Sequence, residues 1–462
     1  MVALGLVAFP ALASAQAAAP RIPVETYTLP NGLTVLLSID HSAPVVAVDV
    51  EHHVGSKNEE VGRTGFAHLF EHVMFTGSGH VPYGMHDKLT EGVGGSNNGS
   101  TNNDKTNFYE SVPSNYLETE LWLEADRLGW LLDALDIAKL NAQRDIVKNE
   151  RRQSYDNRPY GSVGEIIDAE MYPEGHPYHW PVIGSMADLS AASEADVKSF
   201  YNKWYGPNNT VLVIAGDFDP AQAKAWVQKY FGAIAKGPAI TRPTVPAARL
   251  TQPKRFVYED NVSLPQLYIE WAGVGVTSPD RAALGVMGSI LSGDRTQWLT
   301  QEFVYTRKWA SSISIFPGAN ENAGDIGLNV TPTPGADLTK LEAAIDSVIE
   351  RFKQEGPTAE QMKKATASIE YGSYSRLQSM LGKAMTLASG WLYHNDPSWY
   401  AKDLTETLAV TAADVKRVAN TYLGPNRIVL SAVPMGKRAM ASNADKSTPI
   451  TSKFASKAEV GQ

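Results

Sequence analysis

The chain has 462 residues, more than one hydrophobic core usually serves, so we expect at least two domains, each with its own core. A hydrophobic fraction of 43% and a charged fraction of 20% are typical of globular proteins and exclude disordered, collagen-like and coiled-coil chains. The formal charge of -9 argues against nucleic acid as a partner, and the absence of cysteine excludes disulfides, iron–sulfur clusters and thiol nucleophiles, leaving His and carboxylates as metal ligands.

The N-terminus is an apolar run of fifteen residues that ends in Ala13-Ser14-Ala15, a pattern typical of a signal peptidase site. We therefore predict a signal peptide over residues 1–15 and an exported mature chain. No Lys or Arg precedes the apolar stretch, which leaves room for a start upstream of Met1; a buried N-terminal segment is the alternative reading. No later apolar run reaches the eighteen or more residues of a membrane helix, so no membrane span is expected.

The first predicted elements alternate between strands and helices. Pro30-Asn31-Gly32, flanked by β-formers, predicts a hairpin over 27–38, and strict apolar alternation predicts a strand over 45–54. Helices are expected over 65–75, 117–135 and 137–156, with a strand over 107–112 after a stretch rich in Gly, Asn and Ser. This mixture predicts an α+β domain in which helices pack on a mostly antiparallel sheet.

The predicted helix over 65–75 contains His68-Leu69-Phe70-Glu71-His72. On a helix the two histidines lie one turn apart on the same face, the spacing that two ligands of one Zn²⁺ need. Glu71 lies close to that face and can approach a metal-bound water without ligating. A third ligand, a carboxylate, must come from elsewhere in the chain. Two buried histidines, each satisfied by a core polar group, are the structural alternative, although burying three ionisable groups without a function is costly.

A sequence pattern recurs at a constant offset of 218 residues. A helix, a Gly-Pro-Asn turn and a strand are matched by Ala195-Asp196-Val197-Lys198, Gly206-Pro207-Asn208 and Val211-Leu212 in one half, and by Ala413-Asp414-Val415-Lys416, Gly424-Pro425-Asn426 and Val429-Leu430 in the other. We therefore predict two duplicated domains, over 22–235 and 254–436, joined by a Pro-rich linker over 236–253. The polar tail over 437–462 is predicted to be disordered.

H-x-x-E-H is the inverted zincin signature, and its surroundings resemble the pitrilysin/insulinase class of zinc peptidases, in the bacterial branch similar to mitochondrial processing peptidase. The resemblance covers the mature chain to about residue 435. It rests on the segment 64–72, on Gly94-Gly95 with Asn98-Gly99-Ser100-Thr101, on Asp104-Lys105-Thr106 and Phe108-Tyr109, and on 147–153. It implies a zinc endopeptidase acting on unfolded peptides, and a periplasmic location for the exported chain.

The resemblance also implies roles for particular residues. In the family the third zinc ligand is a glutamate about 75 residues beyond the motif, and Glu150 matches it, with 77 residues between it and His72. His68, His72 and Glu150 would then hold one Zn²⁺ per chain, and Glu71 would be the general base. The competing glutamates are Glu110, Glu118, Glu120 and Glu124. Gln143 departs from the family pattern, since many relatives have a glutamate seven residues before the ligand.

Two further expectations concern substrate and partner. Family members add an extended peptide to an edge strand, which Asn98, Gly99 and Ser100 resemble; a flexible turn is the alternative for this Gly/Asn-rich segment. The offset places Val286, Ser289, Ile290 and Ser368 at the metal-site positions of the second domain, so only the first domain is expected to bind metal.

Self-sufficient relatives use a C-terminal arginine and tyrosine, seven residues apart, to bind substrate at the scissile bond. The corresponding positions here hold Val304 and Ser311, and Tyr305 and Arg307 stand nearby in the wrong order. We therefore expect a homologous partner subunit that supplies the missing arginine and tyrosine, with a heterodimer favoured over a homodimer.

The alternative to an enzyme is a non-catalytic scaffold or assembly subunit of the same fold. Such relatives typically have eroded motifs, whereas all four metal and base positions are filled here. Other enzyme classes lack support, since the chain has no G-x-S-x-G elbow, no phosphate-binding G-x-x-x-x-G-K-[ST] loop and no complete G-x-G-x-x-G.

Overall fold

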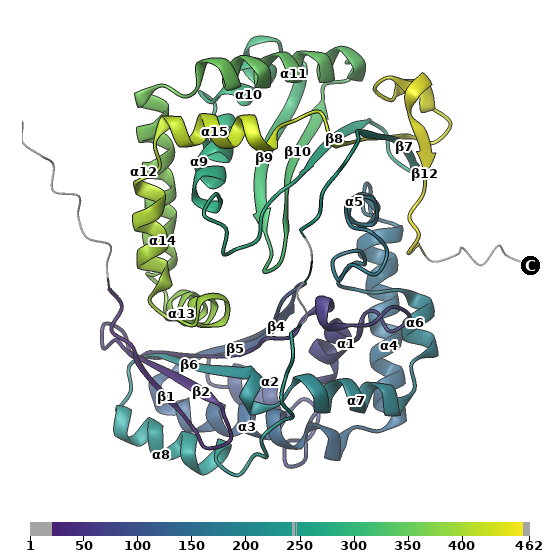
Figure 1. Cartoon of the computed structure of the whole chain (residues 1–462). Helices are drawn as coiled ribbons and strands as arrows, with labels where there is room; N and C mark the ends of the chain where they lie inside the picture. The colour runs from purple at the N-terminus through teal and green to yellow at the C-terminus, as the bar shows by residue number, and fades with distance from the viewer. Residues whose placement is uncertain (1–20, 243–244, 246, 456–462) are drawn as a thin grey trace, which may run out of the picture.

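The computed structural model describes residues 21–242, 245 and 247–455, which form two six-stranded sheets with their helices (Figure 1). The predicted signal peptide over 1–15 lies outside the described residues. Both sheets are mostly antiparallel, which confirms the α+β prediction with two similar domains. In the described part of the chain, no helix combines the length and apolarity needed to cross a bilayer.

The first sheet has the strand order β1-β2-β6-β3-β5-β4. Its strands are β1 (Glu25–Thr28), β2 (Thr34–Ile39), β3 (Val45–His52), β4 (Ser96–Thr101), β5 (Thr106–Pro113) and β6 (Thr210–Gly216). The predicted hairpin is β1–β2, whose turn uses Gly32 at φ 92°, a conformation that favours glycine. β4 is an outer strand of this sheet and pairs with β5 alone.

The helices of the first half pack mainly on one face of that sheet and around its β4 edge. They are α1 (Phe66–Val73), α2 (Met85–Glu91), α3 (Leu117–Ala134), α4 (Ile137–Arg151), α5 (Val163–Met171), α6 (Met186–Ala191), α7 (Glu194–Trp204) and α8 (Pro220–Phe231). The three predicted helices correspond to α1, α3 and α4; a π turn over Arg152–Asp156 continues α4. The apolar valines of β3 join α3 and α8 in one core, as their alternation predicts.

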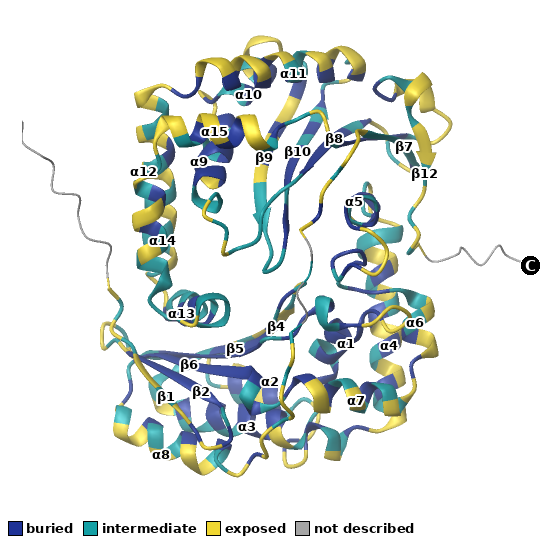
Figure 2. Ribbon diagram, viewed as in Figure 1, coloured by how far each residue is buried: buried dark blue, intermediate teal, exposed yellow. Residues whose placement is uncertain are grey.

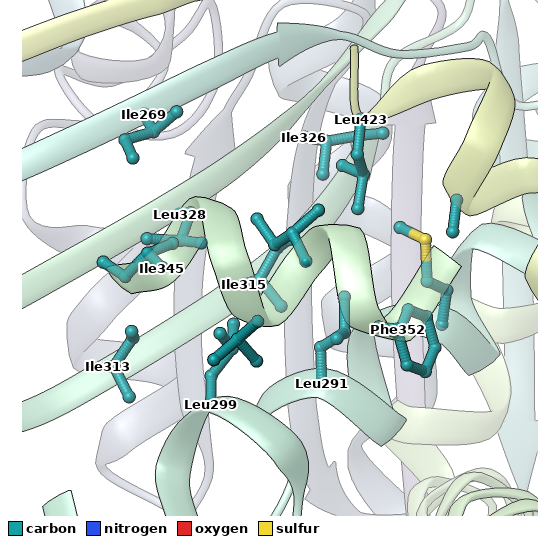
Figure 3. Close-up of a cluster of buried hydrophobic side chains, with 14 of the residues drawn as sticks. Ile269, Leu291, Leu299, Ile313, Ile315, Ile326, Leu328, Ile345, Phe352 and Leu423 are labelled. Carbon is teal, nitrogen blue, oxygen red and sulfur yellow. The ribbon is translucent and has the colours of Figure 1, made fainter. Parts of the chain in front are cut away.

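The second sheet repeats the order, β12-β7-β11-β8-β10-β9. Its strands are β7 (Lys254–Asp260), β8 (Gln266–Ala272), β9 (Ala310–Ala319), β10 (Gly324–Pro332), β11 (Ile428–Pro434) and β12 (Thr448–Ile450); its helices are α9 (Arg281–Ser292), α10 (Trp298–Thr300), α11 (Leu338–Glu355), α12 (Ala359–Arg376), α13 (Met380–His394), α14 (Trp399–Leu408) and α15 (Ala412–Tyr422). Figure 3 shows part of its core, where Ile345 and Phe352 of α11 pack against the sheet and α9. The repeated motif is α7–β6 in one half and α15–β11 in the other.

Each half lends one helix to the other half (Figure 1). α13 packs Ala384 and Leu387 on β2, β3 and β6 of the first sheet, covering the face opposite α3. α5 packs Ile166 and Ile167 on β8 and β11 of the second sheet. Because each exchanged helix covers the other half's sheet, both faces of each sheet are buried over much of their area (Figure 2), and the halves hold one another in place.

The tail is ordered as far as residue 455, so the prediction of disorder over 437–462 is wrong for residues 437–455. β12 adds to the second sheet by parallel pairing with β7, and the Ser442 N–H donates to Ser431 Oγ at 3.0 Å. Polar composition suggested disorder, but these contacts are made mainly by the backbone, whose capacity to pair does not depend on apolar side chains. The described residues of the predicted linker form no helix or strand.

Candidate metal centre

The short helix α1 carries the central motif and is fixed at its N-terminus by a carboxylate from outside the helix. Gly65 stands at the N-cap with φ 90° and has no side chain to cap the helix. The buried carboxylate of Glu59 instead accepts the Gly65 and Ala67 N–H groups, each at 2.9 Å. Leu69, Phe70 and Val73 face the core, and a helix of eight residues depends on such contacts for its stability.

His68, His72 and Glu150 meet at one point, although Glu150 comes from the last turn of α4. Glu150 Oε2 lies 3.2 Å from His72 Nε2 and 3.6 Å from His68 Nε2. These separations suit three ligands that share one tetrahedral ion at about 2.0–2.2 Å. Helix α4 packs directly against α1, which is how a residue so distant in sequence reaches the motif.

The charge states also suit a metal centre. Burial lowers the pKa of His68 to about 4 against the opposing effect of Glu150, so this imidazole is neutral at pH 7 and its Nε2 can donate a lone pair. A hydrogen bond from His72 lowers the pKa of Glu150, which keeps it an anion. Two neutral imidazoles and one carboxylate are the donor set of many catalytic zinc sites, so these residues fit zinc.

Glu71 stands beside the three donors and against strand β4. It is partly exposed, and burial of its carboxyl raises its pKa against the lowering effect of a hydrogen bond from Thr101. A Cβ at Gly99 would lie 3.2 Å from Glu71 Cγ, so glycine at this position leaves room for the Glu71 side chain. Glu71 is therefore free to approach a bound water from the side of β4.

Asn98, Gly99 and Ser100 lie within β4, so the segment is a strand and the flexible-turn alternative is wrong. Gly99 is buried, whereas Asn98 and Ser100 are exposed. The Ser100 hydroxyl donates to Asn107 Oδ1 at 2.6 Å, and the Gly99 N–H donates to Asn98 Oδ1 at 2.8 Å. An open strand edge thus runs beside the candidate base.

The competing glutamates lie away from the two histidines. Glu118 is exposed and pairs with Lys229, and Glu120 accepts a hydrogen bond from Thr90 Oγ1 at 2.9 Å. Glu110 and Glu124 instead form a second cluster, described next. In the second half the equivalents Val286 and Ile290 are buried in the apolar core of α9, where they offer no ligand atom.

Sequence analysis missed the second cluster, in which His86 lies near Glu110 and Glu124. Its three buried residues come from α2, β5 and α3, and no local spacing links them. Arg127 Nη2 lies 3.1 Å from Glu110 Oε1 and also contacts Glu124. The guanidinium therefore fills the place that an ion would take, and we interpret the cluster as a buried ion-pair network rather than a metal site.

The chain matches two models of one peptidase family. Residues 34–177 match "Insulinase (Peptidase family M16)" and residues 191–369 match "Peptidase M16 inactive domain", which together cover well over half of the chain. The second description agrees with the absence of ligand side chains at the metal-site positions of the second half.

Relatives over most of the chain have similar names. The zinc protease PqqE of Helicobacter pylori is 27% identical over 86% of this chain and 90% of its own length. A probable mitochondrial-processing peptidase subunit beta of Arabidopsis thaliana is 25% identical over 88% of this chain and 77% of its own length. The crystal structure of a protease from Helicobacter pylori superposes with a TM-score of 0.84 at 26% identity, covering 90% of this chain and all of that one.

Proposed function

The chain belongs to the insulinase (M16) peptidase family, whose relatives include named zinc proteases, and from this premise we propose that it is a zinc-dependent endopeptidase of unfolded peptides or small proteins. The observation that carries the proposal is the meeting of His68, His72 and Glu150 beside Glu71. Two imidazoles, a carboxylate ligand and a free carboxylate are the groups that metal-assisted peptide hydrolysis requires.

In the proposed mechanism His68, His72 and Glu150 hold the ion. Zinc, when bound, would supply a Lewis acid that lowers the pKa of water towards about 7 and polarises the peptide carbonyl. Glu71 takes the proton from the attacking water and then returns it to the leaving amine nitrogen. The raised pKa of Glu71 brings this carboxylate closer to the pH at which it must both accept and release that proton.

We propose that the substrate adds to β4 as an extended strand, with Asn98, Gly99 and Ser100 as the contact. The outer edge of β4 has unpaired backbone groups that can hydrogen-bond another chain, and main-chain pairing reads no side chains. A peptide held there lies beside Glu71, since Gly99 touches that side chain. The arrangement favours unfolded substrates, because a folded protein presents few extended segments.

The proposed partner is a homologous subunit that supplies an arginine and a tyrosine, in a heterodimer, with a homodimer as the alternative. Val304 packs against the apolar core and Ser311 bonds the Thr331 carbonyl, so neither position offers those groups. Arg307 is paired with Glu302. One relative is named as a subunit, which fits a divided enzyme. Export to a bacterial periplasm, predicted from residues 1–15, completes the proposal.

Hydrolysis of a mixed peptide set by the purified, zinc-loaded mature chain, with Glu71→Gln as the control, tests the proposal. Activity that disappears in the control supports a self-sufficient peptidase and refutes the obligatory partner. Activity that appears only after a co-purifying homologous subunit is added supports the heterodimer. Zinc binding with no hydrolysis under either condition would identify the chain as a scaffold.

A further inference from the structure

Three carboxylates gather where the lent helix α5 meets the second sheet: Asp168 of α5, Glu270 of β8 and Asp325 of β10. Glu270 pairs with Gly327 in the β8–β10 register and Asp325 is two residues from Gly327, so both side chains point to one face. Tyr268 on that face packs against α5. The neighbours of Asp168 in α5, Ile167 and Met171, both pack on the second half, which holds Asp168 against this face.

These three side chains have no cation of their own. Within the described residues, none of them makes a side-chain hydrogen bond or an ion pair with another residue. The nearby cations are already matched: Arg151 with Glu165, Lys254 with Glu170, and Lys57 with Asp104 and Glu321. The cluster therefore carries an excess of negative charge, and mutual repulsion with burial raises the pKa of all three, to about 8 for Asp168.

Two buried polar atoms at the cluster have no protein partner. Glu270 Oε2 is buried without a hydrogen bond, and Glu270 as a whole is 6% exposed. The hydroxyl of Tyr172, a residue 3% exposed, is likewise unpaired, and the charges of Asp325, Asp168 and Glu270 all act on it. Asp168 and Asp325 are partly exposed, so the cluster is open to water on one side. Unpaired buried groups beside an open side indicate a site for a ligand.

The spacing of the oxygens favours an organic cation over a metal ion. The three residues do not form a set whose ligand atoms all lie within 4.8 Å of one another, unlike the two clusters described above. One small ion therefore cannot touch all three carboxylates, whereas a guanidinium or ammonium group with several N–H donors can bridge them.

The floor of the site suits a flat cation. A Cβ at Gly327 would lie 2.8 Å from Glu270 Oε1, so glycine keeps the approach to this carboxylate open. On the other side of Gly327 lies Phe316, its register partner in β9, which is 48% exposed. An aromatic ring next to carboxylates offers a cation both a stacking surface and acceptors.

The cluster is connected to the metal centre through α5. Glu165, one turn before Asp168, forms a fork with Arg151 at 2.9 and 3.0 Å, and Arg151 follows Glu150. The charges of both Glu150 and Asp168 act on the phenol of Tyr155. A peptide bound at the metal centre can therefore place a side chain a few residues away in the carboxylate cluster.

We propose that Asp168, Glu270 and Asp325, with Tyr172 and Phe316, bind a positively charged group of the peptide substrate, an arginine or lysine side chain or the N-terminal ammonium. The inference rests on the proposed peptidase function and adds its substrate class: peptides with a basic group at a fixed distance from the scissile bond.

The test uses one peptide sequence in which a single arginine is moved position by position, each peptide matched by its citrulline counterpart. At one position we expect kcat/KM about tenfold higher for arginine than for citrulline, mainly through KM. In Glu270→Gln/Asp325→Asn the ratio should fall below about twofold, whereas exposed Glu360→Gln should keep it. Peptides with free and acetylated N-termini separate the ammonium from the side chain.

Two further measurements keep the proposal separate from catalysis and from misfolding. Fluorescence anisotropy with zinc-loaded Glu71→Gln measures binding of the same peptides without hydrolysis. A preference for the basic peptide there, with no turnover by the wild type, would overturn the peptidase and leave the site standing. Phe316→Leu at an exposed position should reduce the arginine preference without unfolding the chain. Equal binding and turnover of basic and neutral peptides at every position would overturn the site.

Discussion

The two halves share one sheet order, yet the same structural position has opposite content in each. α1 of the first half carries two histidines and a glutamate, whereas the equivalent stretch of α9 is filled by core residues such as Val286, Met287 and Ile290. α9 needs no outside clamp because its apolar side chains bury it in a large core. α1 is shorter and is capped by Glu59. Reactive groups thus replaced core side chains in one half, and contacts from outside the helix compensate.

The first way to break this comparison is to remove the base at each equivalent position. Glu71→Gln should lower kcat by about 10²–10⁴-fold while zinc stays bound, because only the proton acceptor is lost. Ser289→Ala, at the matching position of α9, should change neither quantity. Steady-state peptide hydrolysis and zinc content by atomic absorption measure both. Wild-type turnover in Glu71→Gln would defeat the mechanism.

The second prediction concerns the ligand that the motif does not contain. Glu150→Ala should release zinc during dialysis, because two imidazoles alone hold the ion far more weakly. Ser368→Ala, its equivalent in the second half, and Glu118→Gln, an exposed competitor, should keep the wild-type metal content. Metal content that is unchanged in Glu150→Ala would transfer the ligand role to another carboxylate.

A third prediction tests the contact between the halves at the β9–β10 turn. Glu321 accepts hydrogen bonds from His53, at 2.5 Å, and from Lys57 across the domain boundary. Burial raises the pKa of Glu321, but His53 and Lys57 lower it more, to about 2 from 4.5. Because burial lowers the pKa of His53, Lys57 provides the positive charge that persists at neutral pH.

A depressed pKa in the folded state stabilises the fold above the unfolded value, and this stability is lost as pH falls from about 4.5 towards 2. Glu321→Gln should therefore cost about 1–3 kcal/mol of unfolding free energy at pH 7 and much less at pH 3. Urea unfolding of both proteins at the two pH values measures the difference. A cost that stays constant with pH would contradict the ion-pair contribution.

The smallest predicted effect is one on which the halves should agree. Ser193 caps α7 and Thr411 caps α15, each in a capping box with an aspartate three residues on. Ser193→Ala and Thr411→Ala should each cost about 1 kcal/mol, since the same orphan N–H groups lose an acceptor. Thermal unfolding of both variants checks this. A clear loss from only one of them would show that the repeated motif is not energetically equivalent.

Much of the fold was predictable because its signals are local. The hairpin turn, the alternation in β3 and the helical spacing of His68 and His72 each lie within a few residues. The duplication was visible because two segments kept the same residues at one offset. The second cluster was not predictable, since His86, Glu110 and Glu124 lie on three elements with no common spacing.

The sequence by itself determined the family, the two-sheet α+β design and the helix that bears His68, Glu71 and His72, because periodicity and motif spacing are written along the chain. Glu150 was reached only through a family resemblance, and the structure placed it within 3.2 Å of His72 Nε2. Tertiary structure alone decided the exchange of α5 and α13, the ordering of the tail on β7, and the meeting of Asp168 with Glu270 and Asp325. These features depend on pairing and packing between distant segments, which no local pattern records.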